Sequence, residues 1–395
     1  MISTATRLLG IHEYYFSQKL REIAGLRAQG HHVLNLGIGS PDLPPSERSI
    51  SALCEAAQQP QNHAYQSYQG ILALREAMSA WYATKFGVNL DASNQILPLI
   101  GSKEGIMHLS MTFLESGDVA LVPNPGYPSY SVCAKLAGAT VRHYDLNAAR
   151  GWLPDLDELA SSDLSSVKIM WVNYPNMPTG ANADRGFFDD LIAFGQAHNI
   201  LIINDNPYAF VLPKGRPLSI MSSVGAFATA VELNSLSKSH NMAGWRIGML
   251  VGDAHYIGEV IRFKSNMDSG MFQPIQVAAV EALRADETWY AALNETYSAR
   301  QKLAIELLNL LGCKPKLPQT GLFVWAKIPE NYADAYTLSD QILEQAKVFI
   351  TPGGIFGSNG NNYVRISLCA TKEVFQAAIS RIESSIVSPQ KNTKI

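Results

Sequence analysis

Apolar runs and longer amphipathic segments alternate along the chain between about residues 95 and 253. The runs are short and rich in Val, Ile and Leu, and several are apolar at nearly every position, as is typical of strands buried on both faces of a sheet. Between them, segments such as 186–199 repeat apolar residues at helical spacing. This alternation predicts an α/β fold, in which helices cover both faces of a mostly parallel sheet. The expected strands are 95–101, 118–123, 140–146, 167–175, 200–206, 228–234 and 247–253.

The pattern changes after about residue 285, where a long amphipathic segment precedes several short apolar runs. We expect a helix over 286–311 and strands near 322–325, 348–350 and 363–367, which together form a smaller α+β unit. The chain before residue 45 contains a helical segment, 13–29, followed by an extended one. We expect this N-terminal part to return and pack with the C-terminal unit.

These patterns divide the chain into three parts. Residues 1–45 form an N-terminal arm and the first part of the small domain, 46–285 form the large domain, and 286–395 form the rest of the small domain. No internal repeat or low-complexity linker interrupts this order. The polar tail at 388–395 is expected to be frayed.

Composition narrows the class of protein. With 47% hydrophobic and 16% charged residues over 395 positions, the chain is too apolar to be disordered. The net charge of -3 and the lack of a basic stripe give no support to a nucleic-acid or membrane-surface partner, so a small-molecule substrate is expected. No apolar run approaches the ~20 residues that span a bilayer, and the N-terminus does not resemble a signal peptide, which makes the cytoplasm the expected location.

The four cysteines and nine histidines do not form a recognisable site. Cys54, Cys133, Cys313 and Cys369 have no paired spacing, so we expect buried, reduced thiols and neither a disulfide framework nor a zinc site. The histidines show no metal-binding spacing, and no metal is expected. The chain also contains no complete dinucleotide or P-loop fingerprint.

Polar residues instead follow directly after four of the predicted strands. Because ligands bind beyond the carboxyl ends of strands in an open α/β sheet, these residues are expected to share one rim. They are a helix start at Gly101-Ser102-Lys103, the segment 173–180, the carboxylate and phenol of Asp205 and Tyr208, and the hydroxyls and amine of Ser235, Ser237 and Lys238.

This combination fits an anionic aromatic cofactor. Backbone amides at a helix start bind phosphate, and Gly101 and Ser102 supply such a start. A lysine at a strand end, partly desolvated and near Arg246, can act as a nucleophilic amine, and Lys238 is the candidate. Asp205 can keep a pyridine nitrogen protonated, which pyridoxal phosphate chemistry requires of its electron sink.

The run SLSKSHNMAGWRIG at 235–248 resembles the class I and II aminotransferases, which are pyridoxal-phosphate enzymes of the aspartate aminotransferase fold, or fold type I. The resemblance covers nearly the whole chain, and the order and spacing of its motifs make it specific. The other motifs are LNLGIGSPD (34–42), AYQSYQGILALREA (64–77), GSKEGI (101–106), PNPGYPSY (123–130), NYPNMPTG (173–180), DNPY (205–208) and YVRIS (363–367).

The resemblance implies roles for individual residues around the cofactor ring. Lys238 would bond covalently to the cofactor and later move the proton between the substrate α-carbon and the cofactor. Asp205 would pair with the ring nitrogen, Tyr208 would bond the ring hydroxyl oxygen, and Tyr127 would stack on the ring.

It also implies how the phosphate and the substrate would be held. The phosphate cradle would comprise Gly101, Ser102, the Lys103 amide, Ser235, Ser237 and Arg246. Tyr65 would reach the phosphate of a neighbouring subunit's cofactor, which implies a homodimer with shared active sites. Arg365 would grip the substrate α-carboxylate, and Gly39 would let the backbone approach the substrate.

Each of these residues also has a plain structural interpretation. Lys238 alone is as consistent with a solvated surface lysine, and Asp205 with a cap on the following turn. Tyr127 can be a packing residue, Tyr65 an interface residue, and Arg365 one half of an ion pair.

One position departs from the family pattern. The family places Asn directly before Pro-Thr-Gly, where it bonds the ring oxygen, but this chain has Met177 there. Asn176 lies one residue earlier and would point the other way in an extended segment. We therefore expect Tyr208 alone to bond the ring oxygen.

The resemblance implies an aminotransferase that moves an amino group between an L-amino acid and a 2-oxo acid. The expected donor is aspartate, alanine or a related amino acid such as LL-diaminopimelate, and the expected acceptor is 2-oxoglutarate. Lys264, Arg262 or Arg300 are possible partners for a side-chain carboxylate. The alternatives are a carbon–sulfur β-lyase on the same fold and a non-catalytic, cofactor-binding sensor domain.

Overall fold

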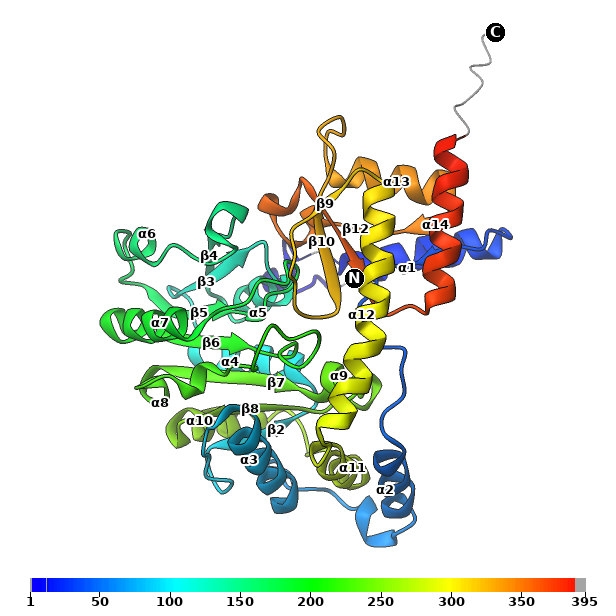
Figure 1. Cartoon of the computed structure of the whole chain (residues 1–395). Coiled ribbons are helices and arrows are strands. Elements are labelled where there is room, and N and C mark those ends of the chain that lie inside the picture. The colour runs from blue at the N-terminus through cyan, green and yellow to red at the C-terminus, as the bar shows by residue number, and fades with distance from the viewer. Residues whose placement is uncertain (1, 12, 388–395) are drawn as a thin grey trace.

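The computed structural model describes residues 2–11 and 13–387 (Figure 1), so the tail at 388–395 lies outside the described residues. A seven-stranded sheet crosses the larger part of the chain, in the order β2-β8-β7-β6-β5-β3-β4. Only β8 runs antiparallel to its neighbours. The strands are β2 (Ile96–Leu99), β3 (Val119–Asn124), β4 (Thr140–Asp145), β5 (Val167–Val172), β6 (Leu201–Asp205), β7 (Ala230–Ser235) and β8 (Gly248–Gly252).

Helices cover both faces of this sheet, and each face has its own apolar core. One core joins the sheet to α4 (Ser102–Phe113), α5 (Pro128–Leu136) and α10 (Ala254–Lys264). The other core includes α3 (Leu72–Phe86), α7 (Arg185–His198) and α11 (Gln273–Leu283), and continues into the small unit. The remaining helices of the large part are α2 (Glu47–Ala57), α6 (Leu156–Ala160), α8 (Ala226–Thr229) and α9 (Leu236–Ser239).

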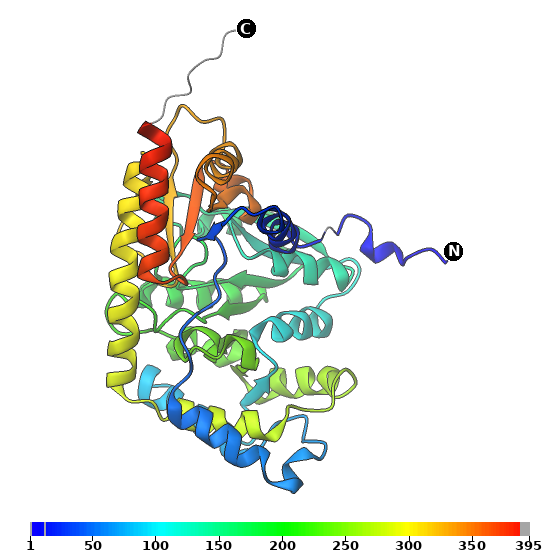
Figure 2. The same cartoon turned by 90° about the vertical axis from the view of Figure 1, so that its right-hand side faces the viewer.

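The small unit is built on a four-stranded antiparallel sheet in the order β12-β13-β10-β9. Its strands are β9 (Lys314–Pro315), β10 (Phe323–Lys327), β12 (Thr351–Pro352) and β13 (Tyr363–Ser367), and its helices are α12 (Glu287–Leu310), α13 (Ala335–Ala346) and α14 (Lys372–Val387). Helices α12 and α14 pack side by side (Figure 2). The Asp286 carboxylate caps α12 by accepting from the Thr288 and Trp289 amides.

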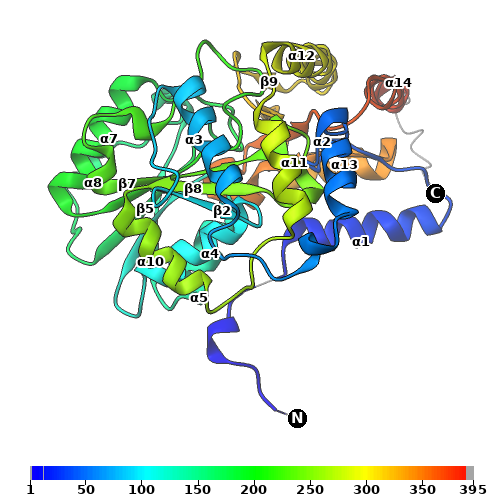
Figure 3. The same ribbon diagram turned by 90° about the horizontal axis from the view of Figure 1, so that it is seen from below.

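The N-terminal part of the chain joins this small unit. After α1 (Tyr15–Ala28), strand β1 (Leu34–Asn35) pairs in parallel with β11 (Val348–Phe349). The chain then crosses to α2 on the large part, and residues 38–40 reach the cavity described below. Before α1, the first residues extend away from the body (Figures 2 and 3).

The structure confirms the α/β fold and all seven expected strands of the large sheet, to within a few residues at their ends. It also confirms the helix near 13–29, the long helix near 286–311 and the return of the N-terminal segment. The strands β9 and β12 and the reversed direction of β8 were not expected. The prediction of buried cysteines is wrong for Cys54, which lies exposed on α2; all four cysteines are free thiols.

Within 2–11 and 13–387, no helix is both long and apolar enough to span a bilayer.

Candidate active site

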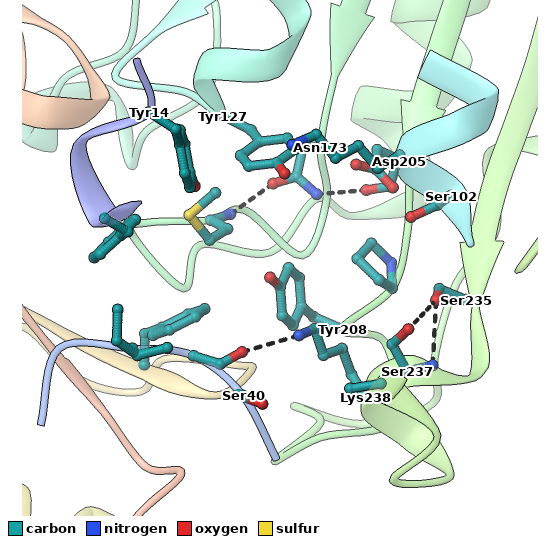
Figure 4. A pocket seen from close by; sticks show the side chains of 18 of the residues that line it. Tyr14, Ser40, Ser102, Tyr127, Asn173, Asp205, Tyr208, Ser235, Ser237 and Lys238 are labelled. Carbon is teal, nitrogen blue, oxygen red and sulfur yellow. Dashed lines mark hydrogen bonds between the residues drawn. The ribbon is translucent and has the colours of Figure 1, made fainter. Parts of the chain in front are cut away.

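A cavity of about 570 Å³ opens at the carboxyl ends of β5, β6 and β7. The start of α4 forms part of its lining, the start of α1 and the residues after β1 form another part, and β10 and β13 contribute from the small unit. Figure 4 shows the polar side chains of this cavity turned toward one another. The strand-end residues that the sequence placed on one rim therefore do meet in one place.

Lys238 lies on α9, the short helix directly after β7, with its side chain in the cavity. Its Nζ donates to the Gly39 carbonyl at 3.0 Å. Burial lowers the pKa of the Lys238 amine; the Cys369 thiol opposes this, and the positive charges of Arg246 and Arg365 add to the lowering. A lysine with a lowered pKa is more often neutral, and a neutral amine is a nucleophile.

Asp205 ends β6 and is buried at the floor of the cavity. Its Oδ2 accepts from the Tyr130 hydroxyl at 2.8 Å, whereas its Oδ1 has no hydrogen-bond partner among the described residues. Burial raises the pKa of Asp205 to about 6. A buried acceptor without a donor is unfavourable, so this oxygen is suited to a ligand that brings a positively charged N–H group.

Five residues in and beside the lining of the cavity form an anion-binding arrangement. Gly101, with φ +77°, turns the chain into α4, and any Cβ there would collide with the Arg246 guanidinium. Ser102 is the first residue of α4, whose unpaired amides face the cavity. The Ser235 hydroxyl donates to Ser237 Oγ at 2.9 Å, and Arg246 Nη1 lies 3.4 Å from the same oxygen. Helix amides, hydroxyls and a guanidinium together favour a phosphate group.

Arg365 projects from β13 and is only 3% exposed, yet it faces no carboxylate in the described part of the chain. One of its terminal nitrogens donates to the Gly37 carbonyl at 2.9 Å, and the other points at the Met177 sulfur at 3.3 Å. The guanidinium lies 3.8 Å from the ring centre of Phe323 and 4.6 Å from that of Phe356. Burial lowers the pKa of Arg365 to about 10.

A buried guanidinium with aromatic faces and an unpartnered Nε atom is suited to a ligand carboxylate. Removing that charge from water is unfavourable unless an anion restores a partner. The interpretation of Arg365 as one half of a structural ion pair is wrong, since no acidic side chain lies against it among the residues described.

Tyr127, Tyr208 and Gly39 also line the cavity. Tyr127 occupies the position directly before α5 and meets Tyr130 edge-on, with ring centres 5.6 Å apart. Tyr208 packs edge-on against Phe323, and burial raises the pKa of its hydroxyl, which keeps it a hydrogen-bond donor. A Cβ on Gly39 would collide with the Phe323 ring, so glycine lets the backbone pass close to the cavity.

The segment between β5 and α7 places Met177, not Asn176, in the cavity. The Asn176 Oδ1 atom accepts from the Thr179 hydroxyl at 2.7 Å and lies away from the lining. Asn173 does line the cavity: its Oδ1 accepts from the Met177 amide at 2.7 Å and its Nδ2 donates to the Asp205 carbonyl. The expectation that Asn176 points the other way is confirmed.

Sequence reasoning missed the aromatic residues contributed by the N-terminal part. Tyr14 and Phe16 line the cavity, whereas the sequence predicted only that residues 13–29 are helical. The Lys103 ammonium lies 5.3 Å from the ring centre of Tyr14. The signal for these residues is the Tyr-Tyr-Phe run at 14–16, where α1 begins, but the position of this run depends on the small unit.

Four residues that the sequence singled out lie outside the cavity. Tyr65 is 91% exposed and does not line the cavity of its own chain. Arg300 pairs with Asp42, and Arg262 lies at the surface beside Glu259. Lys264 is buried between two carboxylates. None of the three cations lines the cavity, so none of them is a side-chain anchor within this chain.

The sequence of the chain is similar to those of known proteins. The family model for aminotransferase class I and II matches residues 31–382. An LL-diaminopimelate aminotransferase of Dehalococcoides mccartyi is 41% identical over 95% of this chain and 97% of its own, and one of Moorella thermoacetica is 39% identical over 96% and 97%.

Solved structures extend the likeness to the fold. The substrate-bound BacF structure from Bacillus subtilis has a TM-score of 0.93 and 35% identity, covering 97% of this chain and 98% of that one. A mutant aspartate aminotransferase of Thermus thermophilus has a TM-score of 0.90 and 25% identity, covering 98% and 100%.

Proposed function

The chain belongs to the class I and II aminotransferases, and from that premise we propose which cofactor, substrates and residues carry its reaction. It is an enzyme that moves an amino group between an L-amino acid and a 2-oxo acid. The cofactor that we propose is pyridoxal 5′-phosphate.

The observation that carries the cofactor proposal is the unpartnered, buried Oδ1 atom of Asp205, in the same cavity as Lys238. A protonated ring nitrogen would give that oxygen a donor and a positive charge, and would favour the ionised carboxylate. The lysine amine and the phosphate-binding arrangement around Ser102 and Arg246 fit the aldehyde and the phosphate of the same molecule. The residues present therefore fit this cofactor.

When bound, pyridoxal phosphate supplies an electron sink that stabilises negative charge at the substrate α-carbon. In our proposal Lys238 holds the cofactor covalently, and its freed amine later takes the proton from the substrate α-carbon and returns it as a general acid. Asp205 holds the proton on the ring nitrogen. Tyr208 donates to the ring hydroxyl oxygen, and Tyr127 covers one face of the ring.

The phosphate is held by the α4 start and by the side chains beside it. In the proposal these are Gly101, Ser102, the Lys103 amide, Ser235, Ser237 and Arg246. Arg365 binds the substrate α-carboxylate through a planar, two-pronged contact, and Gly39 lets the substrate approach the backbone.

For the substrates we propose LL-diaminopimelate as donor and 2-oxoglutarate as acceptor, with aspartate and alanine as the next candidates. The first choice rests on relatives that carry that name and about 40% identity. The apolar walls formed by Tyr14, Phe16 and Phe356 suit the methylene chain of that amino acid.

We also propose that the protein is a cytoplasmic homodimer. The exposed Tyr65 would then bind the cofactor phosphate of the partner subunit, which agrees with its absence from the lining of the cavity in its own chain. The division into 1–45, 46–285 and 286–395 belongs to the same proposal, with residues 38–40 of the first part lying at the cavity.

The test is the absorbance spectrum of the purified, cofactor-loaded protein as LL-diaminopimelate, glutamate, aspartate and alanine are added one at a time. We expect the cofactor band to change with the true donor and to return when 2-oxoglutarate is added. Lys238→Ala is the control, because it removes the covalent link. If pyruvate and ammonia are released from cystathionine and the cofactor band does not change and return in this way, a β-lyase is favoured. Failure of the protein to bind any cofactor would contradict the proposal.

A further inference from the structure

A buried group of charged residues lies beside α4, outside the cavity. It consists of Lys264 with Glu104, His108 and Asp268, and is called the Lys264 cluster below. The Lys264 ammonium is 3.2 Å from Glu104 Oε1 and also bonds Asp268, while His108 Nε2 is 3.0 Å from the same Glu104 oxygen. Lys264 is 2% exposed. Nothing in the proposed reaction uses this cluster.

Glu104 connects the cluster to the start of α4. It lies two residues after Ser102, and its Oε2 accepts from the Ile100 amide, so the side chain closes the turn that contains Gly101 and Ser102. Burial alone would raise the pKa of Glu104, but its contact with His108 and the charge of Lys264 hold this pKa at about 2. The turn is therefore fixed by an ionised carboxylate, which the contacts with His108 and Asp268 and the charge of Lys264 together stabilise.

Asp268 connects the cluster to a second segment. Its Oδ1 accepts from the Gly270 amide at 2.9 Å. Gly270 has φ +82°, and a Cβ there would lie 2.6 Å from the Gln66 carbonyl oxygen and 2.9 Å from that of Ser67. The loop after α10 is thus packed backbone to backbone against the residues that follow Tyr65.

A metal ion is a poorer explanation of the same residues. Glu104, His108 and Asp268 could each offer one ligand atom, and those atoms lie within 4.8 Å of one another. The ammonium of Lys264, however, already contacts both carboxylates and offsets one of their two negative charges. A lysine in that place repels a cation, so the cluster is an ion-pair network.

We propose that Lys264 is a positioning residue for cofactor phosphate: through Glu104 it fixes the α4 start of its own cavity, and through Asp268 it fixes the segment that carries Tyr65. The inference rests on the cofactor proposed above. In a homodimer with shared active sites, Lys264 would then order two phosphate-binding parts. The α4 start would bind the cofactor of its own subunit, and the segment with Tyr65 would bind the cofactor of the partner subunit.

The experiment compares two ligands that differ only in the phosphate. Apoprotein prepared from the wild type and from Lys264→Met is titrated with pyridoxal phosphate and with pyridoxal, and binding is followed by absorbance. We expect the preference for pyridoxal phosphate over pyridoxal to fall about ten-fold in Lys264→Met, as for one lost charge-assisted hydrogen bond. Affinity for pyridoxal itself should be unchanged.

Arg262→Met is the matched control, because it removes a cation from the same helix that lies at the surface. It should keep the wild-type preference. An equal loss of affinity for both ligands in Lys264→Met would mean a general structural role and would overturn the inference, as would an unchanged preference. If the wild type itself binds neither ligand, the proposed cofactor is wrong instead.

Two further variants protect the test against misfolding. Asp268→Asn removes one charge but keeps the size of the side chain and an oxygen that can accept from the Gly270 amide. Because this contact is kept, the preference for pyridoxal phosphate over pyridoxal should fall by less than in Lys264→Met. Gly270→Ala leaves the ion pairs in place and displaces only the contact with Gln66 and Ser67. A folded Gly270→Ala protein with the wild-type preference would contradict the connection to Tyr65.

Discussion

The wall of the cavity formed by the strand ends of the large sheet is polar, whereas the wall opposite is mostly aromatic. We call the first the cofactor wall, made of Ser102, Asp205, Ser235, Ser237, Lys238 and Arg246, and the second the substrate wall, made of Tyr14, Phe16, Phe323, Phe356 and Arg365. On the cofactor wall, a carboxylate, an amine and a guanidinium lie among hydroxyl groups, and the Asp205 Oδ1 atom has no donor among the described residues. On the substrate wall, a single guanidinium lies among rings.

The two walls therefore select their ligands in different ways. The cofactor wall offers several contacts that must all be satisfied by one molecule that stays bound. The substrate wall offers one strong polar contact with apolar surroundings, so it can fix an α-carboxylate while accepting donor and acceptor in turn.

The largest effect is expected on the cofactor wall from Lys238→Ala. Loss of the amine removes both the covalent link and the group that moves the proton, so kcat should fall by about 1000-fold or more. Stopped-flow absorbance and steady-state assays measure this. Lys168→Ala, on an exposed part of β5, is the control and should leave kcat unchanged. A Lys238→Ala enzyme with substantial turnover would contradict the comparison.

The second effect concerns Asp205 and pH. Its pKa of about 6 in the folded chain lies above the ordinary aspartate value of 3.8, because burial disfavours the charge. The apoprotein therefore binds more protons at Asp205 than the unfolded chain does, and stability should fall by about 2–3 kcal/mol as pH rises from 4 to above 6.

Denaturant unfolding of apoprotein and loaded protein at pH 4.5 and 7.5 checks this prediction. In the loaded protein a positively charged ring nitrogen would remove the loss, so the stabilisation by cofactor should be larger at the higher pH. Asp205→Asn apoprotein should lack this part of the pH dependence. The prediction fails if both apoproteins lose stability equally over this range.

The third effect is expected on the substrate wall from Arg365→Lys. A lysine keeps the charge but not the planar, two-pronged contact, so KM for every amino acid should rise by roughly 10- to 100-fold. The cofactor spectrum should stay as in the wild type, since Arg365 does not touch the cofactor wall residues. A change confined to one amino acid would show that Arg365 binds a side chain instead.

The smallest effect is expected where the walls meet, at Met177→Asn. The amide would add a donor beside Tyr208 and Arg365, where the thioether sulfur now faces the guanidinium. We expect KM to fall by about two- to five-fold, in line with one added neutral hydrogen bond. The pH midpoint of the cofactor absorbance band should also fall, because the deprotonated form gains a donor. An unchanged midpoint would show that Tyr208 does not act alone there.

The cofactor wall could be predicted from sequence because its residues follow strands directly. Asp205, Ser235 and Lys238 each occur within three residues of a strand end, and parallel strands bring such ends together. The substrate wall could not be predicted in the same way. Tyr14, Phe16 and Phe356 meet only after the N-terminal and C-terminal parts have packed, which local periodicity does not encode.

Two further differences have the same physical origin. Lys264 was a candidate for a substrate carboxylate because a lysine is normally solvated, but Glu104, 160 positions away, buries it as an ion pair. The direction of β8 was open because a buried strand has the same apolar pattern whether it runs parallel or antiparallel. The burial of Lys264 thus depends on a partner that is distant along the chain, and the direction of β8 depends on its pairing with β7 and with the distant β2.

The pairing of β1 with β11 has a consequence for the order of assembly. Leu34 pairs with Val348, so β1 has no partner until nearly the whole chain has been synthesised, whereas β2 to β8 all lie between residues 96 and 252. Contacts so distant along the chain form slowly. We therefore expect the backbone amides of β5, β6 and β7 to be protected from hydrogen exchange before those of β1 in a nascent or refolding chain. The wall that carries Lys238 would then form early, and the substrate wall would form last.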